Sequence, residues 1–148
     1  MVPVRSDGRI LLARRAAAKT HPLTWEFPAG SALAGETSEE AVIRELAEES
    51  GLRVAPADLT LLRRITESRA FFDLYIASVA EPDVIVPDPA EVAEAHWADL
   101  AEFEQRKASG DFAGPWYDRF DVLGTDLIEA IQRASDLLDA HLDPLEGR

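Results

Sequence analysis

Six glutamates crowd one short segment of the sequence, GSALAGETSEEAVIRELAEESGL, which runs from Gly30 to Leu52. Like charges at helical spacing repel one another and cost stability. Three of these glutamates, Glu45, Glu48 and Glu49, stand three and four residues apart, so a helix would project their carboxylates to one side. A cysteine-free group of carboxylates suits hard cations, above all Mg²⁺ and Mn²⁺. The segment therefore predicts a divalent-metal site, with a solvated acidic helix face as the alternative that spacing alone leaves open.

Two neighbouring features favour the metal site. Arg44 lies next to the cluster, where it can pair with Glu48 or Glu40 at i±4 or hold a carboxylate in orientation. Gly30 and Gly35 flank a loop that must fold back toward the helix. Glycine at such a position lets a backbone carbonyl approach a cation closely.

The elements that must position these residues indicate a mixed fold. Thr37 and Glu40 form a capping-box pair that begins a helix, and Gly51 is placed to end it. Strands are expected from the Asp7–Gly8 turn through Leu12, with residues 2–4 as a partner, and over residues 59–68, 70–79 and 93–97. Residues 25–30 are expected to be extended and residues 112–118 to form a turn. Because strands and helices do not alternate regularly, the order favours an α+β or layered fold.

Two further helices are expected after the last strand. Asp99 caps a helix that runs to about Lys107, and an amphipathic helix spans residues 125–142. The side chains expected on the core face of this last helix are Leu127, Ile128, Ile131, Leu137 and Leu138.

Composition limits the class of protein. A chain of 148 residues with 47% hydrophobic content is expected to form one domain over residues 1–148. The absence of cysteine excludes a disulfide scaffold, a thiolate nucleophile and a sulfur-ligated metal. A net charge of −13 argues against binding nucleic acid or an anionic membrane surface. With no signal peptide or membrane-spanning run in view, we expect a cytoplasmic protein.

The glutamate segment resembles the Nudix box, in which a glycine, glutamates, an arginine and aliphatic residues stand at fixed spacing. Every spacing is met, at Gly30, Glu36, Arg44, Glu45, Leu46, Glu48, Glu49, Gly51 and Leu52. WEFPAG before the box and EVAEAHWADLAEF after it also look like the family, so the likeness runs from about Leu11 to Phe103.

The resemblance implies a Nudix-type α/β/α sandwich around a mixed β-sheet and Mg²⁺- or Mn²⁺-dependent hydrolysis of a diphosphate bond. The substrate would be a small molecule in which a nucleoside diphosphate is joined to another group. Arg44 would orient the carboxylate of Glu45. The implied metal ligands are Glu45, Glu48, Glu49 and the Gly30 carbonyl, with a smaller part for Glu36.

The residue that accepts the proton of the attacking water is expected among the glutamates. In this family it is sometimes a box residue and sometimes one on a later loop. Glu45 is the first candidate and Glu91 the second, although Glu91 is also a candidate metal ligand; Glu94 is a weaker third. Solvation of a loop is the alternative for Glu91 and Glu94.

Residues that contact the substrate are expected in basic clusters near the box. Arg14, with Arg15 and Lys19, and Arg69, with Arg63 and Arg64, are candidates for contact with a phosphate; solvated strand edges are the alternative. Trp25, just before the box, is expected to line the pocket. Phe71, Phe72 and Tyr75 are expected to pack in the sheet or core rather than to stack on a base.

Alternatives to hydrolysis remain open to different degrees. A regulatory module that kept the fold typically loses box glutamates, and all are present here. THPL and GDFAGPW resemble the isopentenyl diphosphate isomerase branch, but that reaction needs a cysteine. The substrate stays open: Glu67 stands where ADP-ribose-cleaving members often carry proline, and the SQPWPFP-like signature of NADH-cleaving members is absent. A homodimer also stays open.

Overall fold

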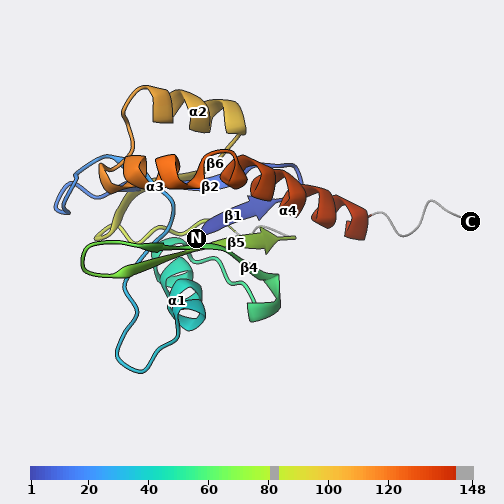
Figure 1. The fold of residues 1–148 in the computed structure, drawn as a ribbon, viewed down its shortest axis with the longest axis horizontal. Helices are drawn as coiled ribbons and strands as arrows, with labels where there is room; N and C mark the ends of the chain where they lie inside the picture. Colours follow the sequence, from blue (N-terminus) through green and yellow to red (C-terminus); the bar gives the residue numbers. More distant parts are fainter. Residues whose placement is uncertain (81–83, 143–148) are drawn as a thin grey trace, which may run out of the picture.

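The computed structural model describes residues 1–80 and 84–142. Figure 1 shows a central sheet with α1 (Ser38–Ser50) on one side and the later helices on the other. This arrangement confirms the α+β sandwich expected from the sequence. The predicted single domain of residues 1–148 includes residues 81–83 and 143–148, which lie outside the described residues.

The described part of the chain forms a six-stranded mixed sheet. Its strands are β1 (Val2–Arg5), β2 (Ile10–Arg15), β3 (Trp25–Glu26), β4 (Leu59–Thr66), β5 (Phe71–Val79) and β6 (Val92–Ala98). They follow the order β3-β2-β1-β5-β4, and β6 pairs with β2. β1 runs antiparallel to β2 and parallel to β5, which makes the sheet mixed. β4 therefore lies at one edge of the sheet, and its pairing with β5 shifts register between Leu61 and Arg63.

Helix α1 (Ser38–Ser50) begins and ends where the sequence predicts. The Thr37 side chain accepts a hydrogen bond from the Glu40 amide, and the Glu40 side chain accepts one from the Thr37 amide. At the other end Gly51 adopts the left-handed conformation, φ 76°, and donates its amide to Ala47. The capping box and the glycine stop are thus confirmed.

The two faces of the sheet bury different sets of residues. On the α1 face, Leu46 is fully buried against Met1, Leu11, Leu52 and Ala77, a contact that stabilises the helix position by roughly 2 kcal/mol. The other face is covered by α2 (Leu100–Ala108), α3 (Pro115–Leu123) and α4 (Asp126–Leu142). Its core is aromatic, built from Phe27, Phe103, Phe112, Trp116 and Phe120.

Several sequence-based predictions were wrong. Residues 115–123 form helix α3 rather than continuing a turn, because Pro115 occupies the first helical turn, where its missing N–H costs nothing. Leu137 on α4 is 62% exposed instead of buried, and α4 extends past the end of the sheet in Figure 1. Phe71 at the start of β5 is 68% exposed, whereas Phe72 and Tyr75 pack as expected.

Within the described ranges, no helix is both long enough and apolar enough to cross a membrane.

Candidate active site

Arg44 on α1 connects the acidic side chains of the site. Its Nη1 donates to Glu45 Oε1 at 2.7 Å and to Glu48 Oε2 at 3.2 Å. Its Nε and Nη2 donate to the two carboxylate oxygens of Glu36, at 2.8 and 2.9 Å. The expected contacts of Arg44 with Glu45 and Glu48 are present, while Glu40 is engaged in the helix cap. One guanidinium therefore holds three carboxylates on one side of the helix.

Glu36 ties the loop before α1 to the same network. Besides Arg44, its carboxylate accepts a hydrogen bond from the Leu33 amide at 2.9 Å. The bonds from Arg44 and then from Leu33 lower the pKa of Glu36 to about 2. Arg44 also donates to the Ser31 carbonyl at 3.1 Å. The loop that carries Gly30 is thus fixed against the helix by ionic hydrogen bonds at two points.

Glu49 lies in a different environment from the other two helix glutamates. It is 6% exposed, whereas the side chain of Glu48 is 58% exposed. Burial, followed by repulsion from Glu26 and Glu45, raises the pKa of Glu49 to about 8. Its Oε2 accepts a hydrogen bond from the Ala29 amide at 3.3 Å. A buried carboxylate among other carboxylates needs a positive charge in order to ionise at neutral pH.

Gly30 leaves room for the Glu45 side chain, which a larger residue would displace. A Cβ built on Gly30 would collide with the carboxyl end of the Glu45 side chain. The backbone of this loop therefore lies in direct contact with Glu45, as expected for a residue whose carbonyl is a candidate metal ligand.

The donor set fits a hard divalent cation. Its members are carboxylate oxygens and a nearby backbone carbonyl, and the charge of Lys19 does not outweigh the effect of burial on Glu49. In residues 1–80 and 84–142, however, no three Asp, Glu or His side chains converge closely enough to hold one ion. Arg44 engages one oxygen of Glu45 and one of Glu48 in this conformation, so the carboxylates must shift before they can converge on one ion.

A cleft of about 620 Å³ opens beside Gly30. It lies between the loop before α1, the β4–β5 hairpin and the start of α3. Two ion pairs line it, Arg15 with Glu26 at 2.9 Å and Arg119 with Glu67 at 2.8 Å. The Arg15–Glu26 pair is largely buried, whereas Glu67 is partly exposed. Burial raises the pKa of Glu26 against the opposing effect of Arg15.

Sequence reasoning missed Glu26 and Arg119, and it gave Arg15 only a general place in a basic cluster. Their partners lie far apart in the sequence, so spacing carried no signal for the Arg119–Glu67 pair. For Glu26 the sequence did carry a signal, the alternation of apolar and polar residues in WEFP. Trp25 and Phe27 are buried in the core, and successive side chains of an extended chain point to opposite faces, so Glu26 points to the other face of the sheet.

Glu91 and Lys19 meet next to the cleft-lining residue Thr20, although neither of the two lines the main cleft itself. The two side chains form an ion pair, and the Ala16 amide donates to the Glu91 carbonyl at 3.0 Å. Glu94 instead pairs with Arg14, at 3.8 Å.

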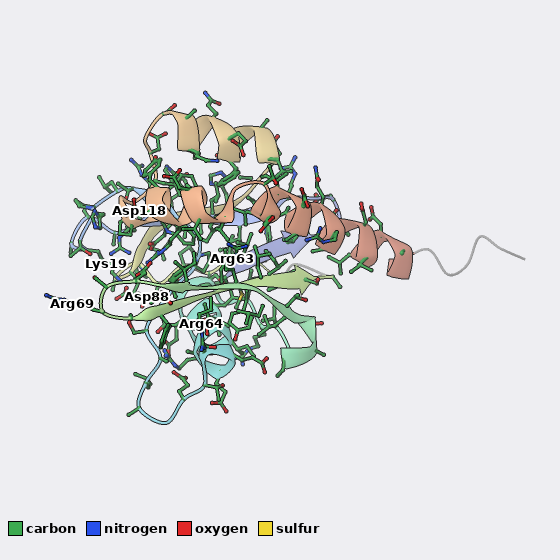
Figure 2. All side chains as sticks on the ribbon, viewed as in Figure 1. Lys19, Arg63, Arg64, Arg69, Asp88 and Asp118 are labelled. Atoms are coloured by element: carbon green, nitrogen blue, oxygen red, sulfur yellow. The ribbon has the colours of Figure 1, made fainter. Side chains whose placement is uncertain are left out.

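The predicted substrate-binding residues lie in different places. Arg14 donates to the Leu23 carbonyl at 2.9 Å, and Trp25 is 5% exposed. Both border a second, smaller hollow together with Arg106, whose guanidinium lies 4.0 Å from the Trp25 ring centroid. Figure 2 shows Arg69 pointing outward from the tip of the β4–β5 hairpin. None of the three lines the main cleft, and their role in binding stays a prediction.

Comparison with known proteins finds a domain family that covers most of the chain. The profile of the NUDIX domain matches residues 1–120. The NAD-capped RNA hydrolase NudC of Escherichia coli O1:K1 / APEC is 41% identical over 101 residues, which are 66% of this chain and 37% of that protein. The RNA pyrophosphohydrolase of Halorhodospira halophila is 45% identical over 62 residues, 42% of this chain and 31% of that protein. The chain thus spans well under half the length that these curated relatives have.

Solved structures share the fold. DR0079 from Deinococcus radiodurans superposes with a TM-score of 0.63 at 23% identity, covering 90% of this chain and 78% of that one. The Nudix hydrolase RenU from M. smegmatis gives 0.55 at 22% identity, over 99% of this chain and 85% of that one.

Proposed function

Since the chain belongs to the NUDIX domain family, we propose that it hydrolyses a diphosphate bond. The substrate is a small molecule in which a nucleoside diphosphate is joined to another group. The observation that carries the proposal is the Arg44 network: one guanidinium orders Glu36, Glu45 and Glu48 beside the buried Glu49.

The metal site consists of Glu45, Glu48, Glu49 and the Gly30 carbonyl, with Glu36 supporting the loop. These oxygens would hold Mg²⁺, or Mn²⁺ in its place. When bound, such a cation neutralises the diphosphate charge and lowers the pKa of a bound water. The protein's own part is positional: Arg44 sets the direction of the Glu45 carboxylate, and Glu36 fixes the loop that presents Gly30.

A carboxylate accepts the proton of the attacking water. Glu45 is the first candidate because Arg44 fixes its carboxylate through Oε1, beside the Gly30 loop. Glu91 is the second, since its loop lies beside Ala16 at the edge of the same region. Because Glu45 is also a proposed metal ligand, Glu45→Gln should lose metal binding and turnover under either assignment. Glu91→Gln separates the two: it should lose turnover alone if Glu91 is the base and keep turnover if Glu45 is.

The end of an RNA is an alternative substrate, because two relatives are named as an NAD-capped RNA hydrolase and an RNA pyrophosphohydrolase. A small molecule is favoured by the net charge of −13, which opposes the approach of a nucleic-acid backbone. In the cleft, Arg15 and Arg119 are both already paired with carboxylates. The sequence also lacks the signature of NADH-cleaving members.

The test is a phosphate-release screen over nucleoside triphosphates, nucleoside diphosphate sugars, dinucleoside polyphosphates, CDP-alcohols and NAD-capped RNA. Each is run with Mg²⁺, with Mn²⁺ and with EDTA. We expect metal-dependent turnover of one small-molecule class, abolished in Glu48→Gln/Glu49→Gln and unchanged in Glu129→Gln, an exposed glutamate on α4. Turnover that persists in EDTA or in the double variant would contradict the proposal, and binding of Mg²⁺ without any turnover would favour a regulatory module.

Three sequence-based expectations stay predictions: a single domain over residues 1–148, a homodimer and a cytoplasmic location. Size-exclusion chromatography with light scattering tests the second of these.

A further inference from the structure

The loop over residues 16–24, between β2 and β3, is held rigidly beside the cleft. Arg15 donates from Nε to the Thr20 carbonyl at 2.6 Å and from Nη2 to Thr20 Oγ1 at 3.0 Å. The same guanidinium donates from Nη1 to both carboxylate oxygens of Glu26, at 3.0 and 2.9 Å. Arg15 thus links the loop to β3, and Thr20 and His21 line the cleft as a result.

The backbone of this loop is also unusual. His21 and Leu23 adopt positive φ angles, 51° and 58°, and they are the non-glycine residues that do so within the described chain. Side chains with a Cβ pay for this conformation, which persists where the surroundings impose it. The Thr24 hydroxyl donates to the His21 carbonyl at 2.6 Å and helps to impose it. The loop therefore fixes the position of the residues it carries, including Lys19.

Lys19 lies where it faces several carboxylates. Its ammonium pairs with Glu91, and its charge lowers the pKa of both Glu26 and Glu49 against the larger effect of their burial. Figure 2 shows Lys19 at the same end of the molecule as Asp88, which begins the turn leading to Glu91.

The Lys19–Glu91 pair is more exposed than the ion pairs of the two arginines that line the cleft, Arg15 and Arg119. The side chains of Lys19 and Glu91 are 31% and 42% exposed, against 15% and 12% for Arg15 and Glu26. Exposed ion pairs contribute little to stability because water competes for both charges. Lys19 can therefore leave its partner at small cost, whereas Arg15 would have to abandon a buried carboxylate.

We propose that Lys19 is a substrate-binding residue whose ammonium transfers from Glu91 to a non-bridging oxygen of the substrate's diphosphate. This inference rests on the proposed function and names a contact of the same site. A diphosphate presents more negative charge than one carboxylate and attracts the ammonium more strongly. The transfer also releases the Glu91 carboxylate, which the free protein keeps paired.

The proposal makes the two members of one ion pair behave in opposite ways. Lys19→Met removes a ligand of the diphosphate, so its affinity should fall by about tenfold, as for loss of one charge-assisted hydrogen bond. Glu91→Gln removes the competitor for Lys19, so the affinity should rise, by roughly two- to fivefold. A pair with only a structural role would shift the affinity in the same direction in both variants.

The experiment measures binding of imidodiphosphate, which resists hydrolysis, by calorimetry in the presence of Mg²⁺. Lys107→Met is the matched control, since Lys107 is the one other lysine of the chain and pairs with Glu104 on α2 at 3.9 Å. Lys19→Arg keeps the charge and should retain most of the affinity. Thermal unfolding of each variant, expected close to wild type, shows that the fold is intact.

Shifts of one sign for Lys19→Met and Glu91→Gln, or equal affinities for Lys19→Met and Lys107→Met, would overturn the inference. So would failure of the wild-type protein to bind imidodiphosphate with Mg²⁺. The proposed function is judged separately, by turnover in the substrate screen, so hydrolysis that is indifferent to Lys19 would leave it standing.

Discussion

Replacing Gly30 by alanine should remove activity while leaving the protein folded. The backbone at Gly30 has no positive φ, so alanine is allowed there by conformation. The new Cβ meets the far end of the Glu45 side chain, a flexible group that can turn away. Because its Cδ, Cγ and Oε1 all lie in the way, the carboxyl group must move by more than about 1 Å, a misplacement that costs on the order of 100-fold in rate.

Gly30→Ala should change the free energy of unfolding only slightly. An off-rotamer side chain costs about 0.5–1.5 kcal/mol. Exchange of glycine for alanine returns about 0.4–1 kcal/mol by restricting the unfolded chain. The net change is therefore within about 1 kcal/mol, or roughly 2–4 °C in Tm for a chain of this size.

The assay compares metal-dependent turnover and thermal unfolding of Gly30→Ala with those of Gly114→Ala. Gly114 is also free of positive φ, and a Cβ there meets nothing closer than 3.7 Å, so its variant should keep wild-type turnover. Wild-type turnover in Gly30→Ala would refute the placement of Glu45 at the reaction centre. Loss of folding would refute the reasoning that the collision is relieved by the side chain alone.

Three further predictions concern the metal, the sheet and the core. Mg²⁺ at about 100 times its Kd should stabilise the protein by about 2.7 kcal/mol, seen as a rise in Tm. Glu48→Gln changes an exposed side chain and should lose most of this rise. An equal rise in the variant would exclude Glu48 as a metal ligand. Arg64 donates to both carboxylate oxygens of Asp73 at 2.7 Å and lowers the pKa of Asp73. The stability that this pair contributes is therefore complete above the ordinary Asp pKa of 3.8 and is lost as the pH falls through the lower pKa of folded Asp73. Urea unfolding should therefore show Asp73→Asn weaker than wild type at pH 7, with the gap closing in acid; a gap independent of pH would contradict this. Trp116 is 1% exposed among other aromatic rings, so Trp116→Ala should lower the free energy of unfolding by about 3–5 kcal/mol, also measured by urea unfolding. A loss below about 1 kcal/mol would contradict this and show that the aromatic core collapses around the gap.

Features fixed by neighbouring residues were predictable from the sequence. Thr37, Glu40 and Gly51 set the ends of α1 through hydrogen bonds that span three or four residues. The direction of Glu45 and Glu48 followed from helical spacing, and Arg44 was placed beside them for the same reason. Local rules succeed here because the contacts themselves are local.

Features that depend on distant partners were not predictable in the same way. Helix α3 was hidden because glycine and proline indicate a turn unless the aromatic residues after them find a core. Leu137 was assigned to the core from periodicity, which cannot show where a sheet ends. The burial of Glu49 and the pairing of Lys19 with Glu91 arise from segments that only the fold brings together.

The parallel pairing of β1 with β5 sets the order in which the molecule can assemble. Val2 to Arg5 contact Ile76 to Val79, so the middle of the sheet joins residues more than 70 positions apart. Loops of that length must close before their contacts contribute anything, which slows folding. During synthesis, β1 and β2 emerge from the ribosome long before β5, and α1 emerges before Ala77 is available to Leu46. Helix α1, which carries the proposed metal ligands, therefore lacks its complete packing surface until the chain has been made past residue 79.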